Sequence, residues 1–328
     1  MAQLRPAVIL PPRGEGHAKT PLFQLLRPAL PTVVHVQGLR RLLHPGPFAK
    51  QPDVLSLSFV DGTVAGCREG DEVRLVANAA ELLAAELRAL PRLPRAVLLS
   101  PSTDPFPPLN EVQHTTVRLV EVLARYGIDS WLMARGFIRP AALDALCRHT
   151  EHVKVTVALT TLDRPLQRLL EPLSAPPRLR LRTLRSLVEA GIAAQAALDP
   201  LIPGVTDTRE HLLPLLEAIA ATGVSQIAVG YLVLHPRTEN DLLAKLRPLG
   251  LDAMVGDEYA RGPLLTRGRS PAGRYLPRSR RQHGYAALMA MAANFGLRLS
   301  VNALTNPDFS PAPPVARSVV DQPAVHLN

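Results

Sequence analysis

Polar side chains gather at the places where apolar, strand-like runs of this sequence end. They are Ser102, Thr103, Asp104, Glu111, Arg135 and Thr160. If the runs form parallel strands, the loops after them meet at one mouth, where ligands and chemistry are usually found. Hydroxyls, carboxylates and a guanidinium at such a mouth can orient a polar ligand or move a proton.

The same residue types also cap helices, which is a competing interpretation at some of these loops. Asp163 and Asp207 stand directly before helical patterns, so capping competes seriously with a functional role there. Asp104 is followed by proline and lies ahead of the capping position. It is therefore the stronger candidate for a site.

Strand-like and helix-like segments alternate along the sequence, and this alternation predicts a parallel barrel. The predicted strands are Val54–Val60, Ala96–Ser100, Ser130–Met133, His152–Thr160, Ala194–Leu198 and Gln226–Leu234. The predicted helices are Ala79–Ala89, Glu111–Tyr126, Pro140–His149, Arg164–Leu170, Arg178–Ala190, Arg209–Thr222 and Asn240–Leu246. Several strands are wholly apolar, which is typical of parallel strands buried on both faces.

This order predicts an α/β fold, a partial (β/α)6-type parallel TIM-like barrel over residues 51–250. We expect an irregular arm rich in proline and basic residues over 1–50. A basic C-terminal extension over 251–309 should pack on the barrel, with a closing helix at His283–Phe295 and an apolar stretch at Leu297–Leu304. The tail over 310–328 is expected to be disordered.

Composition narrows the class of protein. The 328 residues are 47% hydrophobic, enough for a sizeable core. The two cysteines, Cys67 and Cys147, indicate no disulfide framework. We expect a reducing compartment, no signal peptide, no membrane span and a cytoplasmic location.

The segment Arg261–Arg281 contains arginines and no acid, in a chain of net charge +9. Its candidate nucleic-acid-binding residues are Arg267, Arg269, Arg274, Tyr275, Arg278, Arg280 and Arg281. Arginines neutralise phosphates, and a tyrosine can stack on a base, so DNA or RNA is the predicted partner. The alternative is a solvated loop whose arginines pair with acids elsewhere.

Four stretches, in order, resemble the spore photoproduct lyase-like (DNA repair photolyase-like) branch of the radical S-adenosylmethionine enzymes. They are Asn78-Ala-Ala-Glu-Leu-Leu83, Ser102-Thr-Asp-Pro-Phe-Pro-Pro-Leu-Asn-Glu111, Val157-Ala-Leu-Thr-Thr-Leu-Asp163 with Glu171-Pro172, and Ala190-Gly-Ile192 with Pro200-Leu-Ile-Pro-Gly-Val-Thr-Asp207. The similarity spans roughly Arg74 to His235 and weakens toward Leu304. It implies a radical-SAM barrel.

The resemblance implies an S-adenosylmethionine site at the mouth. Ser102, Thr103 and Asp104 match polar positions that face the methionine part of the cofactor in the family, and Arg135 stands where a lysine is frequent. Phe106 and Pro107 replace the family's Tyr and Gln, which removes two hydrogen-bonding groups. Ala158 replaces a serine.

The family's Cys-x3-Cys-x2-Cys motif, which holds a [4Fe–4S] cluster, is missing. We therefore predict no cluster. Cys147 is interpreted as a small buried residue, and no metal is expected at Cys147, His149 and His152.

These features leave three hypotheses. The favoured one is a cluster-free relative that binds nucleic acid or a protein partner. The second is an active enzyme, either with cluster ligands from another chain or with different chemistry at Asp104, Glu111 and Arg135. The third is a structural barrel without a ligand.

Overall fold

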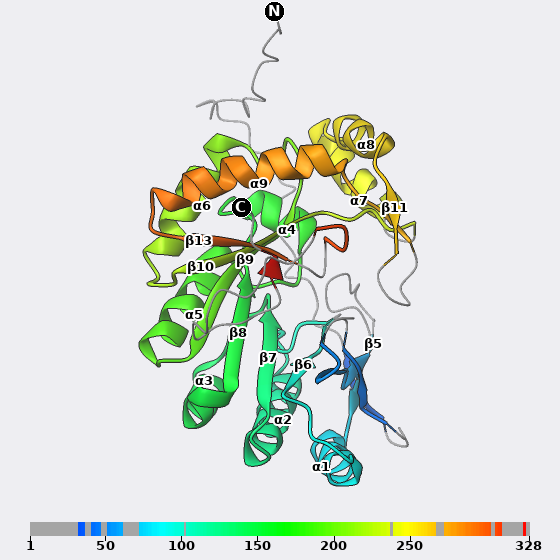
Figure 1. The fold of residues 1–328 in the computed structure, drawn as a ribbon, viewed down its shortest axis with the longest axis vertical. Coiled ribbons are helices and arrows are strands. Elements are labelled where there is room, and N and C mark those ends of the chain that lie inside the picture. The colour runs from blue at the N-terminus through cyan, green and yellow to red at the C-terminus, as the bar shows by residue number, and fades with distance from the viewer. Residues whose placement is uncertain are drawn as a thin grey trace, which may run out of the picture.

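A mostly parallel sheet forms the centre of the computed structural model (Figure 1). The structure describes residues 32–36, 41–46, 51–61, 72–101, 103–236, 239–266, 272–302, 306–309 and 324–325. The order of the strands in the sheet is β14-β13-β10-β9-β8-β7-β6-β3-β2. Their bounds are β2 Leu43–Pro45, β3 Val54–Leu57, β6 Ala96–Leu99, β7 Asp129–Ala134, β8 Val153–Ala158, β9 Ala193–Leu201, β10 Gln226–Tyr231, β13 Arg298–Asn302 and β14 Ala324–Val325.

The strands from β3 to β13 lie side by side in chain order, and all neighbours among them are parallel. Within the described part of this sheet, the edge strands β2 and β14 pair in the antiparallel sense. Parallel neighbours require a crossover between them, and helices supply most of these crossovers. The predicted fold class, an α/β partial barrel, is confirmed.

The helices flank the sheet. Their bounds are α1 Ala79–Ala89, α2 Asn110–Arg125, α3 Pro140–Leu146, α4 Arg164–Leu170, α5 Pro177–Glu189, α6 Arg209–Ala220, α7 Glu239–Leu246, α8 Asp252–Ala260 and α9 Arg278–Ala293. Helices α1 and α4 have the predicted bounds, and the other predicted helices differ mainly at their ends. The helix expected at Pro140–His149 ends as an α-helix at Leu146 and continues as a 3-10 turn over Cys147–His152, with a kink at His149.

The core lies between the sheet and these helices. Strand β6 is buried along its whole length, and its Val97 and Leu99 share one core cluster with the fully buried Leu83 of α1 and Leu123 of α2. Burying a leucine side chain contributes about 1.5–3 kcal/mol. The apolar faces of the helices therefore fix the barrel that carries the loops.

The structure contains elements that the sequence pattern did not predict. Within the arm expected to be irregular, Thr32–Val36 forms strand β1, which pairs in parallel with β5 (Glu72–Val76), while β4 (Val60–Asp61) lies on the other side of β5. β1 reads Thr-Val-Val-His-Val, so β-branched residues outweighed the proline-rich surroundings. Of the tail at 310–328, the structure describes only β14; the prediction of disorder otherwise lies outside the described residues.

No helix in the described residues is long and apolar enough to cross a membrane.

Candidate functional site

The mouth of the barrel begins with the loop after β6. Asp104 lies in this loop, and its Oδ1 accepts a hydrogen bond from the backbone N–H of Phe106 at 2.9 Å. This is a local turn that fixes the carboxylate, not a helix cap, because helix α2 starts six residues later. Thr103 also lies here, and its buried Oγ1 has no hydrogen-bond partner among the described residues. Ser102 lies outside the described residues.

Helix α2 holds this loop in place. Gln113 Nε2 donates to the carbonyls of Pro107 at 2.8 Å and Phe137 at 3.0 Å, so one amide joins the loops after β6 and β7. The Thr116 hydroxyl donates to the carbonyl of Pro105 at 2.7 Å. Two buried side chains therefore fix the backbone around Asp104.

Gly136 allows the two loops to approach closely. A Cβ atom at this position would lie 1.6 Å from the carbonyl oxygen of Phe106 and 2.9 Å from Oδ2 of Asp104. No other residue fits against that backbone without moving it. The glycine thus brings Arg135 next to the Asp104 loop.

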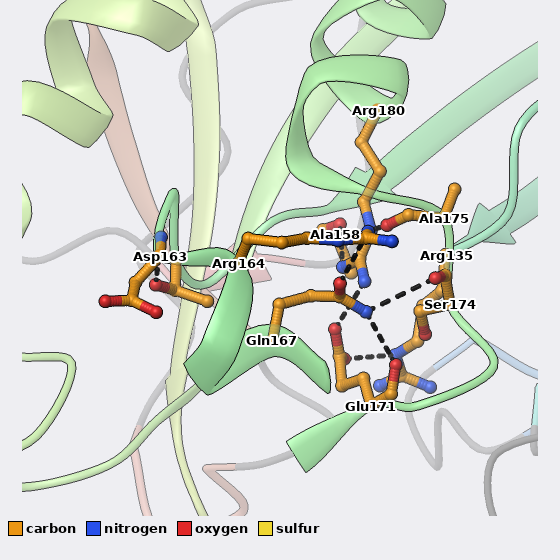
Figure 2. A network of polar contacts seen from close by, with 10 residues as sticks. Arg135, Ala158, Asp163, Arg164, Gln167, Glu171, Ser174, Ala175 and Arg180 are labelled. Atoms are coloured by element: carbon orange, nitrogen blue, oxygen red, sulfur yellow. Dashed lines mark hydrogen bonds and ion pairs between the residues drawn. The ribbon is translucent and has the colours of Figure 1, made fainter. Parts of the chain in front are cut away.

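Arg135 follows β7 and enters a network of charged groups (Figure 2). Its Nε lies 3.4 Å from Oε1 of Glu171, and its side chain is 40% exposed. Arg180 donates through Nη2 to Oε2 of the same carboxylate at 2.6 Å, and its side chain is 1% exposed. One glutamate therefore pairs with two arginines, one at the surface and one in the interior.

The buried Arg180 also binds backbone. Its Nε donates to the carbonyl of Ala175 at 2.8 Å and its Nη1 to the carbonyl of Ala158 at 2.9 Å. Ala158 ends strand β8 and Ala175 precedes helix α5. Arg180 therefore fixes the end of a strand, the end of α4 and the start of α5 together, as Figure 2 shows.

The network continues along α4. Gln167 donates to the carbonyl of Glu171 at 2.7 Å and accepts from Nη1 of Arg164 at 2.9 Å. Asp163 caps this helix, since its Oδ1 accepts from the N–H of Leu166 at 2.8 Å. The capping interpretation is confirmed for Asp163.

Thr160 lies in the loop after β8. The residue is 5% exposed, and its carbonyl accepts a hydrogen bond from Nε2 of His211 at 3.0 Å. His211 lies on α6, so this contact joins α6 to the loop at the mouth.

The surroundings of Asp104 at the mouth shift the pKa of its carboxyl group upward. Burial raises the pKa of this carboxyl group; the N–H of Phe106, a backbone hydrogen bond from Arg135 and the charges of Arg135 and Arg180 offset the shift in part. A buried carboxyl with a raised pKa beside two guanidinium groups is the arrangement expected of a polar binding or acid–base site.

Glu111 does not join this group. It lies in the first turn of α2, is exposed, and pairs with Nε2 of His35 at 2.6 Å. The sequence pattern placed Glu111 at the mouth; its contact is instead with strand β1, which the sequence did not predict.

The basic C-terminal extension is in part interior. Arg281 is 1% exposed; its Nη1 donates to Oδ1 of Asn306 and to Oδ1 of Asp308, each at 2.9 Å. Tyr275 is 4% exposed and its ring lies under the Arg281 guanidinium, with 5.5 Å to the ring centre. Tyr275 is thus not available to stack on a base, and Arg281 is not available to bind a phosphate, because both are packed in the fold.

Arg280 is also engaged. Its Nη2 donates to Oδ2 of Asp207 at 2.9 Å, and its Nε lies 3.4 Å from Oε2 of Glu258. The Tyr231 hydroxyl donates to the same Asp207 oxygen at 2.8 Å, and burial, followed by the charge of Asp207, raises the pKa of Tyr231. Arg280 and Arg281 therefore pair with acids elsewhere in the chain, which is the alternative that the sequence left open for these arginines.

Capping was the competing interpretation of Asp207, but its Oδ1 accepts from the N–H of Gly204 at 2.6 Å, and Thr208 occupies the N-cap position of α6.

The remaining residues of the extension lie nearer the surface. Arg278 is exposed at the start of α9, with its guanidinium 5.4 Å from the centre of the Phe309 ring. Arg274 is half-buried on strand β12 (Gly273–Arg274), which pairs with β11 (Leu264–Leu265). Arg267 and Arg269 lie outside the described residues.

The cysteines do not fit an iron–sulfur cluster. Cys147 lies at the end of α3, six residues before β8 starts, and therefore near the amino end of that strand and away from the mouth. It is exposed, so the prediction that it is buried is wrong: the buried face of α3 consists of Ala142, Ala145 and Leu146, and Cys147 lies next to this face and not on it. Cys67 lies outside the described residues, and two cysteines cannot supply three thiolates. The described residues contain no cluster of His, Cys, Asp or Glu that could hold a metal ion.

Comparison by sequence finds relatives without an assigned function. No protein-family model matches. An uncharacterised protein of Mycobacterium tuberculosis is 28% identical over 243 residues, which cover 72% of this chain and 70% of that protein. An uncharacterised protein of Acidianus two-tailed virus is 26% identical over 136 residues, covering 40% of this chain and 44% of that protein.

Comparison by structure is more informative. A spore photoproduct lyase variant superposes with a TM-score of 0.61 and 14% identity, over 82% of each chain. The fold is therefore similar to that of spore photoproduct lyase. A second variant of that lyase, with bound AdoMet and dinucleoside spore photoproduct, has a TM-score of 0.60 and 14% identity over 81% of each chain.

Proposed function

We propose that this chain is a cluster-free relative of spore photoproduct lyase that binds nucleic acid without cleaving S-adenosylmethionine reductively. The observation that carries the proposal is the cysteine content. The chain has two cysteines, and the described one, Cys147, is exposed near the amino end of β8, while the loops that bear the polar residues are at the carboxyl ends. Reductive cleavage needs the electron of a cluster that three thiolates hold.

Charge supports the nucleic-acid part of this proposal. The chain has a net charge of +9, and Arg278 and Arg274 remain at or near the surface of the basic extension. The structural neighbour described as complexed with dinucleoside spore photoproduct has a TM-score of 0.56. A polyanionic partner is the class that such a charge balance favours.

Two measurements on the full chain test the proposal. Anaerobic reconstitution with iron and sulfide should leave no stoichiometric iron and no broad visible absorption. Labelled single- and double-stranded oligonucleotides should bind with an affinity that falls as salt rises. Stoichiometric iron together with formation of 5′-deoxyadenosine contradicts the proposal that the chain is cluster-free. Absence of salt-dependent binding to the oligonucleotides contradicts the proposal that it binds nucleic acid.

A second candidate function is binding of S-adenosylmethionine at the mouth. The unpartnered Thr103 hydroxyl favours it, because an unpaired buried hydroxyl costs about 1–3 kcal/mol and a ligand can satisfy it. Arg135 would bind the carboxylate of the ligand, and Asp104 would accept from its ammonium group. The ligand supplies an electrophilic sulfonium when bound. Calorimetric titration of the chain with S-adenosylmethionine tests this function. Asp104→Asn should weaken binding. The control Asp53→Asn changes an exposed residue at the amino end of β3, away from the mouth, and should leave binding unchanged.

A further inference from the structure

Helix α5 carries a row of arginines on its exposed face. Arg178, Arg182 and Arg185 are exposed and spaced i, i+4 and i+7, so they share one side of the helix. Arg180, between them in sequence, points inward to Glu171. No acid occurs in α5 before its last residue, Glu189. The row is therefore a continuous positive strip of about two turns.

Helix α4 adds positive charge at the start of this strip. Arg168 is exposed, and Arg164 is half-buried. Burial, followed by the charges of Arg168, Arg178 and Arg180, lowers the pKa of Arg164. In the part of the chain that the structure describes, neither Arg168 nor Arg178 has an ion-pair partner. Like charges held together without acids favour an anion from outside.

A cavity of about 210 Å³ adjoins the strip between α3 and α5. It is lined by Phe137, Ile138, Pro140, Leu143, Asp144, Arg182, Thr183 and Ser186. The Arg182 guanidinium lies 5.9 Å from the centre of the Phe137 ring. Thr183 is 2% exposed, and its Oγ1 has no hydrogen-bond partner among the described residues.

We propose that a single-stranded nucleic-acid segment lies along α5, with phosphates on Arg178, Arg182 and Arg185 and one base in the cavity. This inference rests on the proposed function and gives it a location, on the barrel helices and away from the C-terminal extension. The strip alone fits any polyanion. The cavity favours a nucleic acid, since an aromatic ring and a guanidinium plane are the surfaces on which unpaired bases stack.

Asp144 gives the cavity a base preference. A carboxylate such as that of Asp144 accepts hydrogen bonds, and the exocyclic amine of cytosine is a donor that carboxylates bind. Thymine offers no such amine. A cytosine is therefore the preferred occupant over a thymine.

The first test measures the salt dependence of binding to a labelled single-stranded oligonucleotide. Arg178→Gln/Arg182→Gln/Arg185→Gln should flatten the slope of log affinity against log salt by about 2, since each phosphate contributes roughly 0.7 on single strands. The control Arg88→Gln/Arg125→Gln/Arg298→Gln removes the same charge from exposed positions on α1, α2 and β13. The control should keep the slope of the unmodified chain.

The second test measures base preference. The unmodified chain should bind oligodeoxycytidine about tenfold more tightly than oligothymidine, in line with one good base contact, and Asp144→Asn should reduce that ratio. Loss of a negative charge shifts both affinities equally, so the ratio reports the base contact alone.

The outcomes separate the inference from the function on which it rests. If the unmodified chain binds with salt dependence but both triple variants behave alike, α5 is not the site and the inference is overturned while the proposed function stands. The inference is also overturned if the unmodified chain binds a polyglutamate peptide as tightly as an oligonucleotide and shows no preference between oligodeoxycytidine and oligothymidine. If the unmodified chain binds no oligonucleotide at low salt, both fall.

Discussion

Arg180 and Glu171 form a charge pair across 2.6 Å with the guanidinium fully buried, and the same guanidinium holds the carbonyls of Ala158 and Ala175. The pair connects the end of β8 with the chain that leads into α5. The groups at the mouth therefore depend on one interior arginine. The half-buried Arg135 shares the carboxylate and is placed by it.

Replacing Arg180 with alanine should lower the free energy of unfolding by about 3–5 kcal/mol, because Glu171 and two carbonyls lose a buried partner. Urea unfolding measures the change. Arg178→Ala, two residues away on the exposed face, is the control and should stay within about 0.5 kcal/mol. Equal losses in both variants contradict the role given to Arg180.

The apolar spacing of α5 could have predicted from the sequence that Arg180 points inward, although the high arginine content of the helix favours an exposed position. Arg180 is in register with Leu184 and Leu187, at i+4 and i+7, and both leucines are fully buried. An arginine count describes α5 as a basic helix. The apolar period shows which arginine faces the sheet.

The barrel and its order of strands could be predicted because apolar runs and helical spacing are local properties. The pairing of β1 with β5 could not be, since these two strands are separated by about forty residues and one lies in a proline-rich segment. At the site, the positions of Asp104 and Arg135 at the mouth followed from the loops. The interior positions of Arg281 and Tyr275 did not, because the acid and amide partners of Arg281, Asp308 and Asn306, come later in the chain, and Tyr275 packs under Arg281.

Asp104 should give the stability of the fold a characteristic pH dependence. Burial raises its pKa, so the protonated carboxyl is favoured in the folded state. The stability that it contributes is fully present below the ordinary aspartate pKa and is lost as pH rises through the raised value. Compared with Asp104→Asn, the unmodified chain should therefore lose free energy of unfolding over that window.

Denaturant unfolding at a series of pH values measures this difference. Asp252 is the control of opposite sign: a hydrogen bond from Arg247 is the main cause that lowers its pKa. Its contribution is present above the ordinary value and is lost as pH falls through the lowered one. If Asp104→Asn and the unmodified chain show parallel pH curves, the carboxyl is not buried as described.

Cys147 should react with a thiol reagent in the folded chain, since it is exposed and forms no disulfide. Cys67→Ser leaves Cys147 as the only thiol, and that variant should label fully without denaturant. Cys147→Ser in the same background should abolish labelling. Protection of the thiol until denaturant is added would restore the buried interpretation.

Gly284 on α9 should not tolerate a side chain. A Cβ atom there would lie 2.0 Å from the Tyr231 hydroxyl oxygen and 2.9 Å from the ring carbon that bears it. That hydroxyl donates to Asp207 at 2.8 Å, so moving it breaks a partly buried hydrogen bond. Gly284→Ala should therefore reduce the free energy of unfolding by roughly 1–3 kcal/mol, the cost of overpacking.

Gly256 on α8 is the matched control, because it too is a helical glycine and a Cβ atom there would meet nothing within 4 Å. Gly256→Ala should stabilise the chain by about 0.5–1 kcal/mol through helix propensity. Removing the hydroxyl with Tyr231→Phe should make Gly284→Ala less costly than in the unmodified chain, which a double-mutant cycle detects as a coupling energy. If the two changes add without coupling, the contact between α9 and β10 does not limit the substitution, and the packing of the C-terminal helix over Asp207 and Tyr231 is looser than the structure describes.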